Sequence, residues 1–244
     1  MNTLRIMTYH VQGCRGGDGR VDPQRVLQVI ADGAPDIVAL QGLDTSPGQD
    51  QLQILSERLG MRAYGTGRNG ANAFLSYYPL HGLQDFDLGE GGRCSRADVD
   101  VGGKRLHLLN LRMEPPPRCR RGQIASLLGP ELLGNPSMAC PALVLGDFAD
   151  TFWGAGNFDL ALALRKARRP LWPATFPARF PLVGRDRAYL CGDIRIVDAH
   201  IQRTRVARMA SSHLPLILTV QVTDPRTYLK LKKIHRNRME IAPG

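Results

Sequence analysis

Ala142-Leu143-Val144-Leu145-Gly146-Asp147-Phe148 is a run of four apolar residues that continues directly into Gly-Asp-Phe. A short continuous apolar run is typical of a strand that is buried on both faces. Ile37-Val38-Ala39-Leu40 is a second such run, and Gln41-Gly42 follows it. Asp22-Pro23 opens a helical pattern between strands, and Gly102-Gly103 indicates a hairpin. The interleaving predicts an α/β (α+β) chain with two packed, mixed sheets and helices outside.

The composition is that of an ordinary globular protein. Of 244 residues, 43% are hydrophobic and 22% are charged, which excludes a disordered polymer, a collagen and a coiled coil. The five cysteines are scattered and form no C-x-x-C pair. We find neither a signal-peptide pattern nor an apolar run of membrane-spanning length. We therefore expect a reduced, cytoplasmic protein, with a peripheral position at the inner membrane surface as a second option.

The charge is strongly positive, +10 overall, and much of the excess lies near the end of the sequence. Asp224-Pro225 is a favourable helix start, so we expect a domain over residues 1–223 and a basic helical tail over 224–244. The simpler interpretation of this tail is a solvated helix. The alternative is a contact with nucleic acid or an anionic membrane surface. The basic residues of the tail are Arg226, Lys230, Lys232, Lys233, Arg236 and Arg238.

Polar side chains stand at the ends of the expected strands. His10 ends the first strand, Asn110-Leu111-Arg112 ends the hairpin strand, and Asp147 follows the run at 142–145. Ser212-His213 precedes the last strand. A sheet holds side chains rigidly at its rim, where functional groups often lie. Each residue alone fits a turn or a cap, but their order along the chain indicates one site.

These motifs resemble those of the endonuclease/exonuclease/phosphatase superfamily, a group of metal-dependent phosphodiesterases and phosphatases. The resemblance extends from about Leu4 to Val222. It implies a DNase I-like four-layer sandwich, in which two packed mixed β-sheets are flanked by helices. The stretches that carry it are Leu4–Tyr9, Gly16–Asp22, Pro35–Gln41, Ala71–Ser76, Leu143–Phe148, Thr175–Pro177 and Ser212–Pro215.

The resemblance also implies a set of functional positions, most of which differ here. Family members hold Mg²⁺ through carboxylates and attack a phosphate ester with a water that Asp and His orient. Asp147 and His213 match the family's catalytic residues. The family's metal- or phosphate-binding Asn, main metal-binding Glu and phosphate-contacting His are replaced by His10, Gly42 and Arg112. An Asn and two Asp are replaced by Ala149, Ala188 and Ser212.

These replacements predict a loss of the family's chemistry. Gly42 offers no anionic oxygen to Mg²⁺, and Ser212 leaves His213 without its expected Asp partner. We therefore expect a catalytically inactive member, a pseudoenzyme that needs no cofactor. Three carboxylates are absent and one guanidinium is gained, so the pocket is predicted to favour anions.

The predicted ligand is a phosphorylated small molecule that binds without metal, and a protein partner is the other option. The predicted binding residues are His10, Asn110, Arg112, Arg185 and Arg187. Drift of a vacated pocket explains the same substitutions equally well.

A rebuilt metal site is a further alternative. His10, Asp147 and His213 are residue types that can ligate Zn²⁺ or Mn²⁺ and leave a position open for water. In that case the chain is a divergent phosphodiesterase, phosphatase or nuclease with Mg²⁺ or Mn²⁺ as cofactor.

Overall fold

The computed structural model describes residues 3–44, 50–65, 72–136, 138, 140–149, 160, 163–166 and 173–224. The six basic residues of the predicted tail lie outside the described residues. Among the described helices, none combines the length and the apolar character needed to cross a membrane.

Two six-stranded sheets form the framework. The first sheet contains β1 (Thr3–His10), β2 (Ile37–Gln41), β3 (Arg62–Tyr64), β4 (Ala73–Ser76), β11 (Ile194–Ile201) and β12 (Leu216–Val222). The second contains β5 (Leu80–Gly89), β6 (Gly92–Val101), β7 (Lys104–Arg112), β8 (Ala142–Asp147), β9 (Arg165–Lys166) and β10 (Asp186–Cys191). Their strand orders are β11-β12-β1-β2-β4-β3 and β5-β6-β7-β8-β10-β9.

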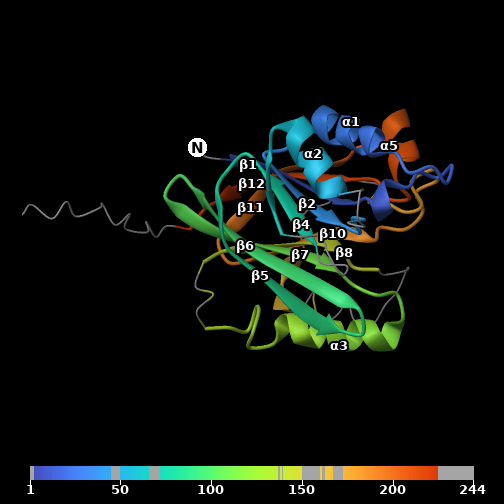
Figure 1. Cartoon of the computed structure of the whole chain (residues 1–244). Helices are drawn as coiled ribbons and strands as arrows, with labels where there is room; N and C mark the ends of the chain where they lie inside the picture. Colours follow the sequence, from blue (N-terminus) through green and yellow to red (C-terminus); the bar gives the residue numbers. More distant parts are fainter. Residues whose placement is uncertain are drawn as a thin grey trace, which may run out of the picture.

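Helices cover the outer faces of both sheets (Figure 1). The helices are α1 (Pro23–Gly33), α2 (Gln51–Leu59), α3 (Pro117–Leu128) and α5 (Arg205–Ala210), with a short 3₁₀ turn at Gln12–Cys14. In Figure 1, α1, α2 and α5 lie on the first sheet, and α3 lies below the second. The arrangement confirms the predicted sandwich of two mixed sheets between helices.

Side-chain alternation along β8 connects two apolar clusters. Leu143 and Leu145 pack into the large core that both sheets share, whereas Val144 packs into a smaller cluster with Ile124 of α3. Successive side chains of a strand point to opposite faces. Asp147 follows Leu145 by two residues, so its carboxylate points between the sheets at the rim.

Parallel pairing brings the polar strand ends together. β1 pairs in parallel with β2, which sets His10 opposite Gln41. β7 pairs in parallel with β8, which sets Arg112 opposite Asp147. Parallel strands end at the same edge of a sheet. The two sheets therefore present these polar residues at their carboxyl ends.

Gly146 allows β8 to lie close to β7. Its φ is +143°, and a Cβ at this position would lie 2.0 Å from the carbonyl oxygen of Leu111. Only glycine fits this approach. The close packing of β8 on β7 therefore explains why a glycine precedes Asp147.

Asn110 joins the two sheets. Its side chain is fully buried, and Nδ2 donates to the carbonyl oxygens of Leu40 and Ala73, each at 3.0 Å. Its Oδ1 accepts from Gln41 Nε2 at 2.6 Å. Both hydrogens of Nδ2 are thus used inside the protein. The prediction that Asn110 contacts a ligand needs correction, because its amide group binds the first sheet instead.

We predict that Asn110→Ala lowers the free energy of unfolding by about 2–4 kcal/mol, because it leaves buried carbonyls and an amide unsatisfied. Urea denaturation followed by circular dichroism measures the change. Gln53→Ala is the control, because its exposed side chain only pairs with Glu57. The control should change stability by less than about 0.5 kcal/mol. Equal effects of the two substitutions would contradict the role of Asn110.

Candidate active site

Two histidines and two aspartates meet between the sheets. His10 ends β1, Asp147 ends β8 and Asp186 begins β10, while His213 lies in the loop between α5 and β12. Asp147 and Asp186 are each 1% exposed, His213 is 2% exposed and His10 is 9% exposed. The sandwich therefore holds four ionisable side chains in a largely dehydrated place.

Asp147 is the centre of the contacts. Its Oδ2 lies 2.8 Å from His10 Nδ1 and 3.9 Å from His213 Nε2. The two imidazole rings stack with their centroids 4.5 Å apart. His213 Nδ1 lies 2.9 Å from Asp186 Oδ2, so the four residues form one chain of contacts.

Asp186 orients His213, which corrects the expectation that His213 lacks such a partner. The resemblance placed the expected partner at position 212 and a second acid at position 188, two residues further along β10 than Asp186. Residues two apart on a strand point to the same face, so a carboxylate at 186 reaches the same side as one at 188. With Nδ1 bound to Asp186, His213 directs Nε2 toward Asp147. A search for acidic residues two positions before Ala188, on the same face of the strand, would have found Asp186 in the sequence.

Arg185 binds both oxygens of Asp147. Its Nε donates to Oδ1 at 3.3 Å and its Nη2 donates to Oδ2 at 3.1 Å. The amide of Ala149 also donates to Oδ1, at 2.8 Å. The guanidinium lies 4.9 Å from the ring centre of Phe176, which in turn contacts the His213 ring. Arg185 is thus fixed against the carboxylate from one side.

These contacts decide the charge of Asp147. Burial alone would raise the pKa of its carboxyl. The hydrogen bond from His10 and the positive charges of His213 and Arg185 outweigh burial and hold this pKa well below its ordinary range. Asp147 is therefore ionised at neutral pH.

The two histidines have opposite tendencies. Burial lowers the pKa of His10 and outweighs its hydrogen bond to Asp147. Burial also opposes the charge on His213, but the charge and hydrogen bond of Asp186, together with the charge of Asp147, raise its pKa. The site therefore favours a neutral imidazole at His10 and an imidazolium at His213.

Gly42 and His10 are sterically matched. A Cβ at position 42 would lie 2.6 Å from His10 Nε2, and φ of Gly42 is +66°, in the left-handed region that favours glycine. The imidazole thus fills the space that a side chain at position 42 would need. A glutamate introduced at position 42 alone would require His10 to move.

The remaining predicted ligand residues lie at different distances from the cluster. Arg112 reaches the rim and pairs loosely with Glu114, at 3.7 Å, rather than with Asp147. Arg187 is buried, and its Nε donates to the carbonyl oxygen of Gly184 at 2.7 Å. Alternation along β10 turns Arg187 to the face opposite Asp186. The structure therefore brings His10 and Arg185 into the cluster and leaves Arg187 outside it.

The cluster contains a set of possible metal ligands. One ligand atom each of His10, Asp147 and His213 lies within 4.8 Å of the other two. Two imidazoles and one carboxylate suit Zn²⁺ or Mn²⁺ better than Mg²⁺, which prefers oxygen. This donor set conflicts with the expectation that no metal is bound.

Comparisons with known proteins agree with this architecture. Residues 7–213 match the model of the endonuclease/exonuclease/phosphatase family, and the chain belongs to that family. No curated protein matches the chain in sequence.

Solved structures show the same fold at low identity. An endonuclease/exonuclease/phosphatase from Bacteroides vulgatus is 18% identical, with a TM-score of 0.75 over 91% of this chain and 100% of that one. The protein of the same description from Beutenbergia cavernae is 19% identical, with a TM-score of 0.73 over 91% and 72%. A mannosyl-6-phosphatase from Bacteroides thetaiotaomicron is 17% identical, with a TM-score of 0.71 over 89% and 99%.

We predict that His213 titrates above the ordinary histidine pKa of about 6.5 and His10 below it. Nitrogen-15 NMR of histidine-labelled protein, assigned with His→Gln variants, measures both. Asp186→Asn should lower the pKa of His213, because it removes the largest favourable charge. The reverse order of the two histidines would contradict the assignment.

The same shift affects stability. A folded-state pKa above the unfolded value stabilises the protein fully below the unfolded pKa, and the contribution is lost as pH rises through the folded pKa. The stability difference between the parent and Asp186→Asn, measured by urea denaturation, should therefore shrink as the pH rises from below about 6.5 through the raised pKa of His213.

Proposed function

We propose that this chain binds a phosphorylated ligand at the pocket formed by His10, Asp147, Arg185 and His213, and does not hydrolyse it by the magnesium-dependent route. The observation that carries the proposal is the position of Arg185. Its guanidinium lies against both oxygens of Asp147, where a cation held by this carboxylate would lie. A fixed side-chain cation thus stands in the role of a metal ion.

The donor set argues against Mg²⁺ at this place. Mg²⁺ needs anionic oxygens in near-octahedral geometry. Position 42 offers none, and His10 fills the space where a side chain there would lie. Oδ2 of Asp186 is occupied by His213, and both oxygens of Asp147 are occupied by Arg185. A magnesium ion at Asp147 would have to displace Arg185, and Oδ1 of Asp186, which has no hydrogen-bond partner among the described residues, is a single further oxygen.

The same groups suit an anion. Arg185 uses two N–H groups on Asp147 and has further donors in its planar fork, which matches phosphate geometry. Its side chain is 18% exposed, so part of it is accessible from the rim. His213 favours the protonated form, and Arg112 adds a charge at the rim. Together they can pair with a phosphate dianion in a place of low dielectric.

Titration calorimetry with inorganic phosphate, mannose 6-phosphate and adenosine monophosphate tests the proposal; the sugar phosphate is included because one structural neighbour is a mannosyl-6-phosphatase. We expect one of these probes to bind. Arg185→Gln should weaken binding by about 10- to 100-fold, the range for a lost charged hydrogen bond.

Arg195→Gln is the matched control, because this exposed arginine on β11 has only Gln221 as a side-chain partner among the described residues and lies away from the cluster. Binding that Arg185→Gln leaves unchanged would refute the anion site. Rapid magnesium-dependent hydrolysis of a bound probe would refute the absence of catalysis.

A metal-dependent phosphoesterase is the second candidate, and one observation favours it. Asp186 binds Nδ1 of His213 and leaves Nε2 directed at Asp147, as carboxylates do behind metal-bound histidines. His10 favours its neutral form, which metal binding requires. A transition metal there would supply a Lewis acid and an activated water. Its binding would displace Arg185 and the proton of His213.

Metal analysis of protein purified without chelator separates the two candidates. The second candidate predicts about one Zn²⁺ or Mn²⁺ per chain. His213→Ala should lose the metal, whereas His81→Ala, at an exposed histidine, should keep it. Metal-dependent hydrolysis of bis-p-nitrophenyl phosphate should follow the metal content. Metal-free protein that still binds phosphate would exclude this candidate.

A further inference from the structure

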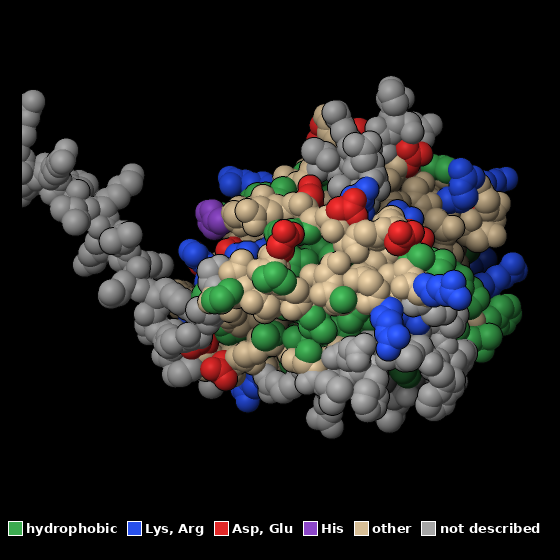
Figure 2. All heavy atoms as spheres, turned by 90° about the horizontal axis from the view of Figure 1, so that it is seen from below, with side chains coloured by type: hydrophobic (Ala, Val, Ile, Leu, Met, Phe, Trp, Pro, Cys, Tyr) green, Lys and Arg blue, Asp and Glu red, His purple; other side chains and the backbone are tan. Residues whose placement is uncertain are grey.

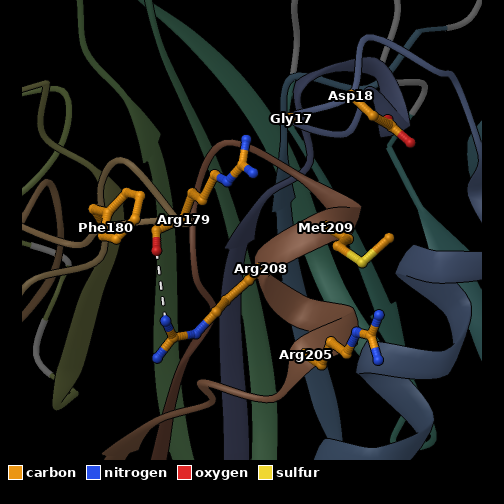
Figure 3. A pocket seen from close by; sticks show the side chains of 7 residues that line it. All are labelled: Gly17, Asp18, Arg179, Phe180, Arg205, Arg208 and Met209. Atoms are coloured by element: carbon orange, nitrogen blue, oxygen red, sulfur yellow. Dashed lines mark hydrogen bonds between the residues drawn. The ribbon is translucent and has the colours of Figure 1, made fainter.

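A cavity of about 450 Å³ lies beside α5, outside the His–Asp cluster (Figure 3). Figure 3 shows Arg179 and Phe180 on a loop at one side and three side chains of α5 at the other. The loop runs next to the cluster, because the Ala178 amide donates to the Ser212 carbonyl oxygen at 2.7 Å. The lining residues are Gly17, Asp18, Arg179, Phe180, Arg205, Arg208 and Met209.

The cavity carries an excess of positive charge. Among the described residues, no carboxylate forms an ion pair with Arg179, Arg205 or Arg208. Arg208 Nη1 instead donates to the Arg179 carbonyl oxygen at 3.5 Å (Figure 3). Asp18, the acid in the lining, is already paired with Arg25 at 2.8 Å. Three arginines therefore line one cavity without a paired carboxylate in the described part of the chain.

This distribution differs from that of another face. Figure 2 views the molecule from below Figure 1, on the side of α3. There, acidic, basic and hydrophobic side chains are interspersed in the described part of the surface (Figure 2). The unbalanced charge at the cavity is thus not repeated on the described part of this face.

Exposed apolar side chains border the arginines. Phe180 is 71% exposed and Leu182 61% exposed, both near the tip of the loop that Phe176 and Val183 close by pairing. Met209 of α5 is 42% exposed. Single exposed apolar residues are ordinary, but a cluster of them marks an interaction site. Here Phe180 and Met209, from segments far apart in the sequence, line the same cavity, and Leu182 follows Phe180 by two residues.

We propose that the cavity and the loop tip form a docking surface for an anionic lipid membrane. Phe180 and Leu182 enter the interfacial region, and Arg179, Arg205 and Arg208 pair with the lipid phosphates. Amphipathic surfaces bind membranes through this combination of buried apolar area and attraction to anionic headgroups. Docking in this orientation also sets the His–Asp cluster close to the headgroups.

The aliphatic side chains favour lipid over nucleic acid. Single-stranded nucleic acid binds to aromatic faces on which bases stack, along a basic groove. Leu182 and Met209 have no such face, and only Phe180 does among the apolar residues at this surface. Aliphatic chains gain free energy in hydrocarbon and little on a nucleic acid, whose interfaces are polar.

Vesicle co-sedimentation of the full chain tests this surface. Vesicles of phosphatidylcholine with about 30% phosphatidylglycerol should bind, and pure phosphatidylcholine vesicles should bind much less. Arg179→Glu with Arg205→Glu should weaken binding by at least about 25-fold, because each basic residue near such a surface contributes about fivefold. Phe180→Ser with Leu182→Ser should also weaken it, and added salt should weaken the parent.

Two matched controls lie on β3 and β11, the two edge strands of the first sheet, and neither residue lines the cavity. Arg62→Glu changes an exposed arginine of β3, and Val197→Ser changes an apolar residue that is 56% exposed. Both controls should bind vesicles like the parent within about twofold, and each variant's melting curve should match the parent.

Equal vesicle binding by the docking-surface variants would overturn the proposal. Binding of a thymidine oligonucleotide, lost in the Arg179 variant while vesicles do not bind, would assign the surface to nucleic acid instead. Neither outcome affects phosphate binding at Arg185.

Discussion

The ionised carboxylate of Asp147 is the constraint on which the site depends. It is 1% exposed and lies between two apolar sheets, where an unpaired charge would cost several kcal/mol. Arg185, His10 and the Ala149 amide all bind it, and His213 lies within 4 Å. These groups pack around one charge. As a result, the ring of His10 stacks on that of His213, and Phe176 contacts both His213 and Arg185.

The relation of this site to its family is a question of which cation balances that charge. In family members a carboxylate-bound metal ion bridges to phosphate. Here the guanidinium of Arg185 balances Asp147, and His10 fills the space next to Gly42. Gly42 and His10 fit one another, because a side chain at position 42 and the present His10 ring cannot share the same space.

The fold was predictable from the sequence because its central strands have a single way to be buried. The runs at Ile37–Leu40 and Ala142–Leu145 are apolar on both faces, so only a central strand satisfies them. β5 was missed, since its side chains are mostly exposed and show no apolar pattern. The helix α5 was missed for a similar reason: it is six residues long and buries only Ala207 and Ala210.

The site was predictable only in part, because a residue's role depends on the face to which its strand turns it. Asp147 and His213 stand at strand ends in the sequence, and the structure brings them together. Arg187 was expected beside them, but alternation turns it away, and the same alternation lets Asp186 serve in place of an acid at 188. Asn110 shows the converse: its side-chain amide lies at a strand end, but its hydrogen bonds go to backbone carbonyls of the other sheet.

Charge connects the cluster with the docking surface. In the cluster, Arg185 lies against Asp147, and Asp186 raises the pKa of His213, so each carboxylate has a basic side chain beside it. At the cavity beside α5, no described carboxylate pairs with Arg179, Arg205 or Arg208. The loop that carries Arg179 continues to Arg185, and its Phe176 ring contacts His213. A phosphate-bearing surface that orders the loop tip would therefore act on the same segment that fixes Arg185 against Asp147.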